Sequence, residues 1–385
     1  MKTPLILVNI TAILIGVSYG LHGPILPVFA KNVIGASYIE LGIIGFANFI
    51  PYMFIPLFVG VLLDRFNNGL LLSVGVMINS ASIYLLSIAQ TVPEVVGFRI
   101  MTGIAHAFFW PPCESIISKV SGEKSRVRNI ATFTAFFVGG FMIGPLIGSL
   151  LLEAFDVTFR ILFQYAAFVL AAAIVSALVL TQHGTTRLHT RFSFSSIKEM
   201  TRFPHVIVML IYCTASFGMI LAIYPAFLDD RGITGSGIEI LYFAFGISRL
   251  VTLGAAGKLA KRTSHTLIVA TLSIAIGLLI SFYAESIELF IVAMLIMGFG
   301  FSIFFPLTLD IILSRTRKDI SGGVIGAYET TFGIGWAVGP ITAGIISQFF
   351  GNDAPYLVFF VFGLAITVLA IIKKKSLEPQ RNTNL

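Results

Sequence analysis

Long runs of apolar residues, separated by short polar breaks, repeat along this whole chain. A helix needs about 20 apolar residues to cross a bilayer, and its backbone must satisfy its own hydrogen bonds there. The runs are too long and too continuous for the short alternating strands of a β-barrel. They predict twelve membrane helices: 4–30, 38–63, 69–90, 93–118, 128–153, 159–181, 205–228, 237–260, 265–284, 287–313, 320–350 and 355–372.

The composition excludes a water-soluble protein. Of the 385 residues, 57% are apolar and 11% are charged, whereas soluble domains have about 45–50% apolar and about 25% charged residues. The bilayer must therefore be the main solvent, which excludes soluble enzymes and nucleic-acid binders. Both cysteines, Cys113 and Cys213, lie in apolar runs, so we expect small buried side chains and no disulfide framework.

The basic residues predict the orientation in the membrane. With both termini in the cytoplasm, 20 of the 25 Lys and Arg residues fall on the cytoplasmic side. The outer side holds only Lys31, Arg160 and Arg231, while Arg99 and Arg249 lie within helices. This asymmetry follows the positive-inside rule and explains the net charge of +7 without a nucleic-acid partner. We expect a multi-pass protein of the cell (inner) membrane with both termini cytoplasmic.

The chain also contains an internal repeat. A shift of 195 residues aligns Gly103 with Gly298, Pro111 with Pro306, Gly140 with Gly335, and Gly144-Pro145 with Gly339-Pro340. We therefore predict an all-α integral membrane protein with two pseudo-symmetric six-helix bundles, residues 1–182 and 204–374. A cytoplasmic linker, 183–203, joins them, and 375–385 form a cytoplasmic tail. Bundles of six helices start on the same side, which favours a binding site near the midplane between them.

The loop after the second helix carries the motif Gly60-x-Leu62-x-Asp64-Arg65. Together with two six-helix halves and a basic linker, it resembles the major facilitator superfamily, most closely the twelve-helix drug–proton efflux antiporters. The resemblance implies a cytoplasmic gate in which Gly60 allows close helix approach and Asp64 meets the start of helix 11, near 319–323. The chain departs from the family pattern G-x-L-x-D-R-x-G-R-R at its last three positions. Lys119 also stands where the family has an acidic residue, so Asp64 could pair with Lys119 or Arg65 instead.

Two glycine–proline motifs lie in helices 5 and 11. They are Gly140-x-x-x-Gly144-Pro145-x-x-Gly148 and Gly335-x-x-x-Gly339-Pro340. Small residues four positions apart let helices pack backbone to backbone. In the resembling family such a stretch in helix 5 is typical of antiporters, while generic helix packing explains it equally well.

Charged side chains within membrane helices are functional candidates, because burying a charge in the bilayer is costly. The candidates for proton coupling are Arg99, Glu114, Arg249, Asp310 and Glu329. Arg249 and Glu329 both come to about 14–18 Å depth at about 1.5 Å per residue. We therefore predict that they form an ion pair in which Glu329 carries the proton.

The other charges have alternative explanations. Arg99-x-x-x-Gly103 is similar to the helix 4 arginine motif that the superfamily links to proton coupling, but a structural ion pair or a snorkelling side chain explains it too. Arg99, His106 and Glu114 are expected on nearly one face of helix 4. Asp310 could instead pair with a basic residue at the cytoplasmic surface.

A few polar and aromatic residues are candidates for lining a substrate cavity: His22, His106, Trp110 and Phe305. His22 could equally lie in water at the outer end of helix 1. His106 is explained at least as well by a hydrogen-bonded core histidine.

These features predict a secondary transporter that exports a small organic molecule in exchange for protons. A proton symporter that imports a sugar or an organic anion is the alternative, with Arg99 and Arg249 holding the anion. A receptor or channel fits the composition but not the duplication with charges in both halves. The sequence has no phosphate-binding loop and no metal-ligand spacing, so we expect no enzyme, no cofactor and no metal. The expected partners are the substrate, protons and lipid, and the protein is expected to be a monomer.

Overall fold

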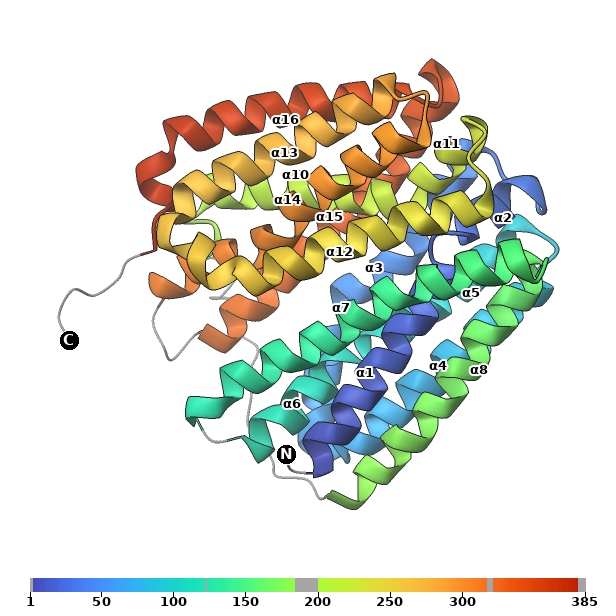
Figure 1. The fold of residues 1–385 in the computed structure, drawn as a ribbon. Coiled ribbons are helices and arrows are strands. Elements are labelled where there is room, and N and C mark those ends of the chain that lie inside the picture. The colour runs from blue at the N-terminus through green and yellow to red at the C-terminus, as the bar shows by residue number, and fades with distance from the viewer. Residues whose placement is uncertain (1–2, 122, 184–199, 317–320, 380–385) are drawn as a thin grey trace.

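The computed structural model describes residues 3–121, 123–183, 200–316 and 321–379, and every regular element in these ranges is helical. Figure 1 shows two bundles side by side, the first blue to green and the second yellow to red. The first bundle contains α1 (Thr3–His22), α2 (Leu26–Asn32), α3 (Tyr38–Arg65), α4 (Asn68–Ile88), α5 (Val92–Ala107), α6 (Trp110–Val120), α7 (Glu123–Ala154) and α8 (Phe159–Val179). The second contains α10 (Pro204–Ala222), α11 (Tyr224–Asp230), α12 (Gly235–Leu259), α13 (Thr263–Tyr283), α14 (Ile287–Ser314), α15 (Ser321–Phe350) and α16 (Ala354–Ile372).

The described helices account for the twelve predicted membrane crossings. Ten stretches are long and apolar enough to cross a membrane, and one of them, Gly235–Tyr283, contains both α12 and α13. The broken pair α5 and α6 supplies the remaining crossing. The predicted all-helical fold of two six-helix bundles is therefore confirmed, with span ends that differ from the helix ends by at most five residues.

The first crossing of each bundle is a broken helix where the sequence predicts one continuous helix. The chain breaks between α1 and α2, and at Ile223 between α10 and α11. Pro27 and Pro225 lie in the first turn of the short helices α2 and α11. A backbone N–H has no partner within the helix at that position, so proline, which lacks one, loses no hydrogen bond there. The breaks fall at equivalent positions, so they belong to the repeated unit.

The fourth crossing is also broken, between α5 and α6, whereas its counterpart α14 is continuous. Pro111 and Pro112 follow one another and remove two successive backbone donors, and Phe108 and Phe109 close the turn with short-range bonds. In α14 the single Pro306 is tolerated within the helix. The expectation that Glu114 shares one face of helix 4 with Arg99 and His106 assumed one continuous helix, and the break puts Glu114 on α6 instead.

Packing follows the same scheme in both bundles. In the first, α7 and α8 pack on α1, and α5 and α8 pack on α4; in the second, α15 packs on α10, and α14 and α16 pack on α13. The main contacts between the bundles are made by two helix pairs, α3 with α15 and α7 with α12, and α3 also touches α10. The short helices α2 and α11 also touch, and Figure 1 places them at the opposite end from the two termini. We name these two ends the α2–α11 end and the terminus end.

The glycine–proline motif of α7 lies against α1. A Cβ on Gly144 would come within 2.7 Å of the Gly20 Cα, and one on Gly20 would meet the Pro145 ring. Gly140 similarly faces the backbone at Gly16. The small residues therefore allow the two backbones to touch.

The equivalent motif of α15 lies against α10. The space at Gly339 is filled by the backbone of Ala215, and a Cβ on Gly218 would come within 2.9 Å of the Pro340 ring. Pro340 also meets Gly45 of α3, so this motif contributes to the contact between the bundles.

Candidate substrate and proton site

The central polar contact joins the two bundles through Glu329. This residue lies in α15, and its Oε2 accepts a hydrogen bond of 3.4 Å from the hydroxyl of Tyr52 on α3. Glu114, on α6, lies close enough for its charge to act on both side chains. Two carboxyls from different bundles thus flank one tyrosine. Because like charges repel strongly in a low dielectric, this arrangement favours keeping a proton on the pair.

A row of aromatic rings extends across the interface from this tyrosine. The ring of Tyr52 is 5.4 Å from that of His106 and 6.1 Å from that of Trp336. Trp336 in turn stacks on Phe217 at 5.6 Å and meets Phe332 edge-on at 4.8 Å. Aromatic walls with a few convergent polar groups are typical of sites for small organic ligands.

Arg249 stands at the far end of this row, inside a cage of three phenylalanine rings. Its guanidinium is 5.2 Å from the ring of Phe217, 5.5 Å from Phe245 and 5.9 Å from Phe141. Its Nε has no hydrogen-bond partner, and no described carboxylate forms an ion pair with it. In this conformation the predicted pair with Glu329 is not formed, and cation–π contacts compensate the charge instead.

A second group of polar side chains lies inside the first bundle, around Arg99. Arg99 interacts electrostatically with Tyr19, His22 and His106. Within the part of the chain that the structure covers, it forms no ion pair with an acidic residue, and its Nε has no hydrogen-bond partner. The predicted proximity of Arg99 and His106 is therefore found.

His106 has both ring nitrogens engaged. Trp110 Nε1 donates to His106 Nε2 at 3.0 Å, and the Tyr19 hydroxyl is 2.8 Å from His106 Nδ1. An indole N–H can only donate, so Nε2 must accept, and the proton of the neutral ring lies on Nδ1. This geometry favours a hydrogen-bonded core histidine over a proton carrier.

The other candidate cavity residues have different surroundings. The side chain of His22 is fully buried, and its Nδ1 is 2.6 Å from the Ser18 carbonyl oxygen, so it faces neither water nor an open cavity. Phe305 is partly exposed and packs on Tyr328 and Phe332. Asp310 is exposed on α14, and no described interaction joins it to the Glu114–Glu329 pair.

The predicted gate at the terminus end is only partly described. The helix α3 includes Gly60 and Asp64, but their side-chain surroundings lie outside the described part, as does the start of the predicted helix 11 at 319–320. Arg65 is exposed at the last residue of α3, and Lys119 lies in the last turn of α6. The Asp64 pairing therefore stays a prediction.

A polar seal closes the α2–α11 end, and the sequence analysis missed it. Lys31 of the first bundle forms ion pairs with Asp229, at 3.6 Å, and with Asp230. Asp230 also accepts hydrogen bonds from the Tyr38 hydroxyl, at 2.6 Å, and from the Asn352 amide, at 2.7 Å. The repeat could have revealed this, because near the start of each half the shift is 198 residues, as between Pro27 and Pro225, and this shift places Asp229 on Lys31. Equivalent positions with opposite charges face each other across the symmetry axis.

The carboxyl of Asp230 is ionised in this seal. Partial burial acts to raise its pKa, but the hydrogen bonds from Lys31, Tyr38 and Asn352, with the Lys31 charge, hold the pKa below its ordinary value. The seal is therefore strongest where this carboxylate is charged.

The sequence analysis also missed Glu239, although it falls inside a predicted membrane helix. Glu239 is fully buried in α12, and neither carboxyl oxygen has a hydrogen-bond partner. The carboxyl lies against Gly148 of α7, the last glycine of the helix 5 motif. The rule that singles out intramembrane charges would have found it.

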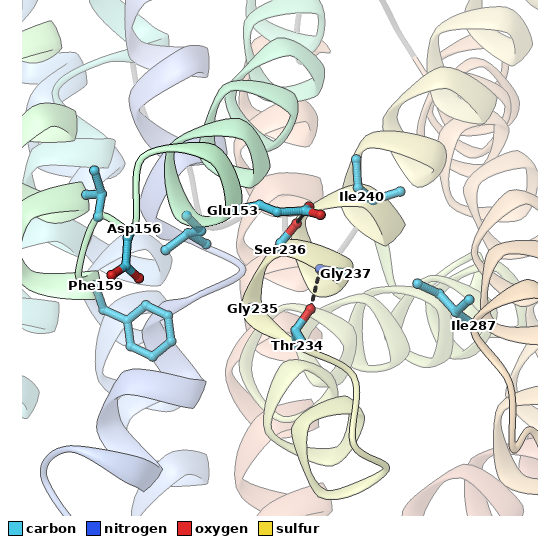
Figure 2. A pocket seen from close by; sticks show the side chains of 11 residues that line it. Glu153, Asp156, Phe159, Thr234, Gly235, Ser236, Gly237, Ile240 and Ile287 are labelled. Carbon is cyan, nitrogen blue, oxygen red and sulfur yellow. Dashed lines mark hydrogen bonds between the residues drawn. The ribbon is translucent and has the colours of Figure 1, made fainter.

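A hollow of about 630 Å³ lies at the α2–α11 end between α7 and α12. Figure 2 shows the carboxylate of Glu153 turned toward Ser236 on its wall, with Thr234 and Ile240 nearby and Asp156 on the opposite side. The hollow is therefore an opening in this part of the interface with both acidic and apolar side chains on its wall.

Comparison with known proteins places this architecture in a family. The sequence profile described as "Major Facilitator Superfamily" matches residues 8–265 and again residues 206–384. Multidrug resistance protein 1 of Bacillus subtilis is 25% identical over 79% of this chain and 80% of its own length. Quinolone resistance protein NorA of Staphylococcus aureus is 22% identical over 98% of this chain and 97% of its own.

A solved structure shows the same fold. A variant of the nucleoside transporter NupG superposes with a TM-score of 0.80 at 12% identity, covering 96% of this chain and 99% of its own. With residues 8–384 matched by the family profile and two six-helix bundles joined at a central interface, this protein belongs to the Major Facilitator Superfamily and is a membrane transporter, not an enzyme.

Proposed function

We propose that this transporter exports a small organic molecule in exchange for protons. The observation that carries the proposal is the contact of Glu329 with Tyr52 across the bundle interface, with Glu114 nearby. A carboxyl at the meeting point of two moving bundles changes its surroundings when they separate. Its affinity for a proton then depends on conformation, which is what coupling requires.

The cycle follows from the cost of an ionised carboxylate in the bilayer. When the Tyr52 contact and the neighbouring Glu114 are in place, Glu329 keeps its proton. When the bundles move apart at this interface, Glu329 loses the contact with Tyr52 and the neighbouring charge of Glu114. It can then release its proton. Arg249, which lies at the end of the same aromatic row, is the cation proposed to meet Glu329 in that other state.

The substrate is proposed to lie along the aromatic row between Tyr52 and Arg249. The rings of Trp336 and Phe217 offer flat apolar surfaces to a ring-containing molecule. Two relatives bear names that refer to multidrug and quinolone resistance, which supports export of such compounds.

A second candidate function is proton-coupled import of an organic anion. The observation that favours it is Arg249, a caged cation for which the described residues offer no carboxylate partner. The two functions differ in the direction of proton flow. Adding substrate outside sealed vesicles should make the medium more alkaline if substrate and protons enter together by symport. In antiport the medium should become more acidic, because protons leave the vesicles as the substrate enters.

The remaining expectations complete the proposal. We infer a cell-membrane protein with bundles 1–182 and 204–374, a cytoplasmic linker 183–203 and a cytoplasmic tail 375–385, acting as a monomer. The excess of basic residues at the terminus end supports a cytoplasmic location for that end. With that orientation, the α2–α11 end that Lys31, Asp229 and Asp230 close faces outward.

The test is the variant Glu329→Gln in everted vesicles with an imposed pH gradient and a panel of dyes and metabolites. We expect gradient-driven accumulation to fall at least about ten-fold, the equivalent of about 1.4 kcal/mol of lost coupling. Substrate binding and counterflow exchange should persist, because the amide keeps the shape of the side chain.

Glu288→Gln is the matched control, since Glu288 is an exposed carboxyl at the start of α14 and should leave transport unchanged. Undiminished accumulation in Glu329→Gln would move the coupling role to Glu114 or Asp310.

A further inference from the structure

A second carboxyl, far along the chain from the central pair, is buried at the bundle interface. Glu239 is wholly inaccessible to water, and both its oxygens lack a hydrogen-bond partner. Its Oε1 is only 2.8 Å from where a Cβ on Gly148 would stand. The absence of a side chain at Gly148 thus provides the space that this carboxyl occupies.

No described cation compensates Glu239. Facing it on its own helix is Tyr242, which also interacts with Tyr224 of α11. On α7, the only titratable side chain toward this end is Glu153, at the exposed rim. On α14, the titratable side chains are Glu288 and Asp310, both exposed. An isolated carboxylate in such surroundings is penalised severely, so the carboxyl is held here as the neutral acid.

A line of hydroxyls leads from the exposed rim toward this acid. Ser236 Oγ donates to Glu153 Oε2 at 2.6 Å, and Ser149 Oγ is 2.8 Å from Ser236 Oγ. The hydroxyl of Ser236 has a single proton, which it donates to Glu153. Ser149 must therefore donate to Ser236. The three groups therefore form one directed hydrogen-bonded chain.

The inner end of this chain adjoins Glu239 on both helices. Ser149 follows Gly148 directly on α7, and Ser236 lies three residues before Glu239 on α12, which is one helical turn on the same face. The outer end, Glu153, lines the hollow shown in Figure 2. The chain thus leads from open space at the α2–α11 end toward the buried acid, and its last link, from Ser149 to Glu239, is not made in this conformation.

We propose that Glu239 is a proton-binding site of the α7–α12 interface, loaded from the α2–α11 end through Glu153, Ser236 and Ser149, and separate from the Glu114–Glu329 pair. The ligand is the proton itself, which moves along the hydroxyls from the Glu153 carboxyl to the Glu239 carboxylate. Glu239 binds it while the interface opens, and the neutral acid is then buried when α7 and α12 close. The proposal rests on the protein being a two-bundle transporter and not on the direction of substrate transport.

Infrared difference spectroscopy of the reconstituted protein tests the site directly, because a neutral carboxylic acid has its own carbonyl band. Near neutral pH, wild-type protein should show such a band that Glu239→Gln lacks. The band should survive in Glu329→Gln, which separates this site from the proposed coupling residue. It should also survive in Glu288→Gln, the control that removes an exposed carboxyl outside the proposed route.

The loading route is tested by hydrogen–deuterium exchange of that band. Combining Ser149→Ala with Ser236→Ala should slow the exchange several-fold while leaving the band in place, and this variant keeps the test available should Glu239→Gln fail to fold. An unchanged neutral-acid band in Glu239→Gln would overturn the proton site. Exchange at the wild-type rate in the double variant would overturn the route.

Discussion

Single residues hold the two bundles together at the α2–α11 end through charge. Lys31 reaches across to Asp229 and Asp230, and Tyr38 and Asn352 add hydrogen bonds to the same carboxylate. An isolated exposed ion pair contributes about 0–1 kcal/mol, whereas several charges and donors in one network contribute more. The seal is therefore strong enough to favour one conformation and weak enough to open during a transport cycle.

Reversing the charge of Lys31 should open this end. We expect Lys31→Glu to destabilise the closed state by about 1–2 kcal/mol, which changes its population by about 5–30-fold. A cysteine placed at the buried position Ala222, which packs against Gly45 of α3, reports the opening. Its labelling by a membrane-impermeant thiol reagent added from the α2–α11 side should accelerate accordingly. Arg160→Glu, on the same side but hydrogen-bonded only within its own bundle, is the control and should have little effect.

The same probe should respond to pH in a defined direction. The pKa of Asp230 is lowered in the closed state, so its stabilisation is fully present above the ordinary Asp value of about 4 and is lost as the pH falls through the lowered value. The rate of labelling at position 222 should therefore increase under acidic conditions in the protein that retains Lys31. A labelling rate that falls with acidification would contradict this role for Asp230.

At the scale of helices, close backbone contacts replace the hydrophobic effect, which gives no drive between helices in lipid. The contact of α1 with α7 depends on glycines whose Cβ positions are occupied by the partner backbone. The contact of α10 with α15 depends on glycines in the same way. Each bundle thus contains a backbone contact of the same kind at equivalent helices, which explains why the glycine–proline motif recurs.

Two glycines of α7 provide a matched pair for testing this. At Gly144 an added Cβ would press on the backbone at Gly20, while at Gly139 it would meet nothing within 4 Å. Gly144→Ala should destabilise the protein by about 1–3 kcal/mol through overpacking. Gly139→Ala should be neutral or stabilising by up to about 1 kcal/mol through helix propensity. Cys113 and Cys213 are buried, so a thiol-reactive dye reports thermal unfolding in detergent. Equal melting temperatures for the two variants would contradict the packing argument.

At the scale of the molecule, the two bundles meet along α3–α15 and α7–α12, and both interfaces carry a carboxyl whose surroundings depend on how the bundles sit. Glu329 meets Tyr52 at the first interface, and Glu239 meets Gly148 at the second. Movement of one bundle against the other therefore changes both sites.

The orientation of the molecule is tested with two cysteine tags, one at Thr190 in the linker and one at Ile233 near the α2–α11 end. We expect a membrane-impermeant reagent on intact cells to label position 233 and to leave position 190 unlabelled. The reason is the excess of basic residues on the side of the linker. The two native cysteines are buried, so the background is low. Labelling of both positions from outside would overturn the topology.

Much of this architecture could be predicted from the sequence, because lipid imposes simple constraints. Each crossing must be one apolar helix of sufficient length, and the Gly and Pro residues that recur at a constant shift reveal the duplication. The same reasoning located most of the charges inside the membrane, though not Glu239, and put Arg99 and His106 on one face of a helix, where the two side chains interact. Broken crossings were missed at Ile223 and at the Pro111–Pro112 pair, since local proline chemistry interrupts a helix without interrupting its apolar pattern.

The sequence by itself determined the crossings, the repeat and the candidate charges, because these depend on the composition of one segment at a time. Only the tertiary structure decided which charges meet. Depth along the helices suggested Arg249 as the partner of Glu329. Depth does not determine which helix faces turn toward each other, however. In the structure Arg249 lies among phenylalanine rings, and Glu329 contacts Tyr52. The contacts of Lys31 with α11 and of Glu239 with Gly148 likewise depend on how α2 meets α11 and how α7 meets α12. Contacts between distant segments follow from helix packing in three dimensions, which no single stretch of sequence contains.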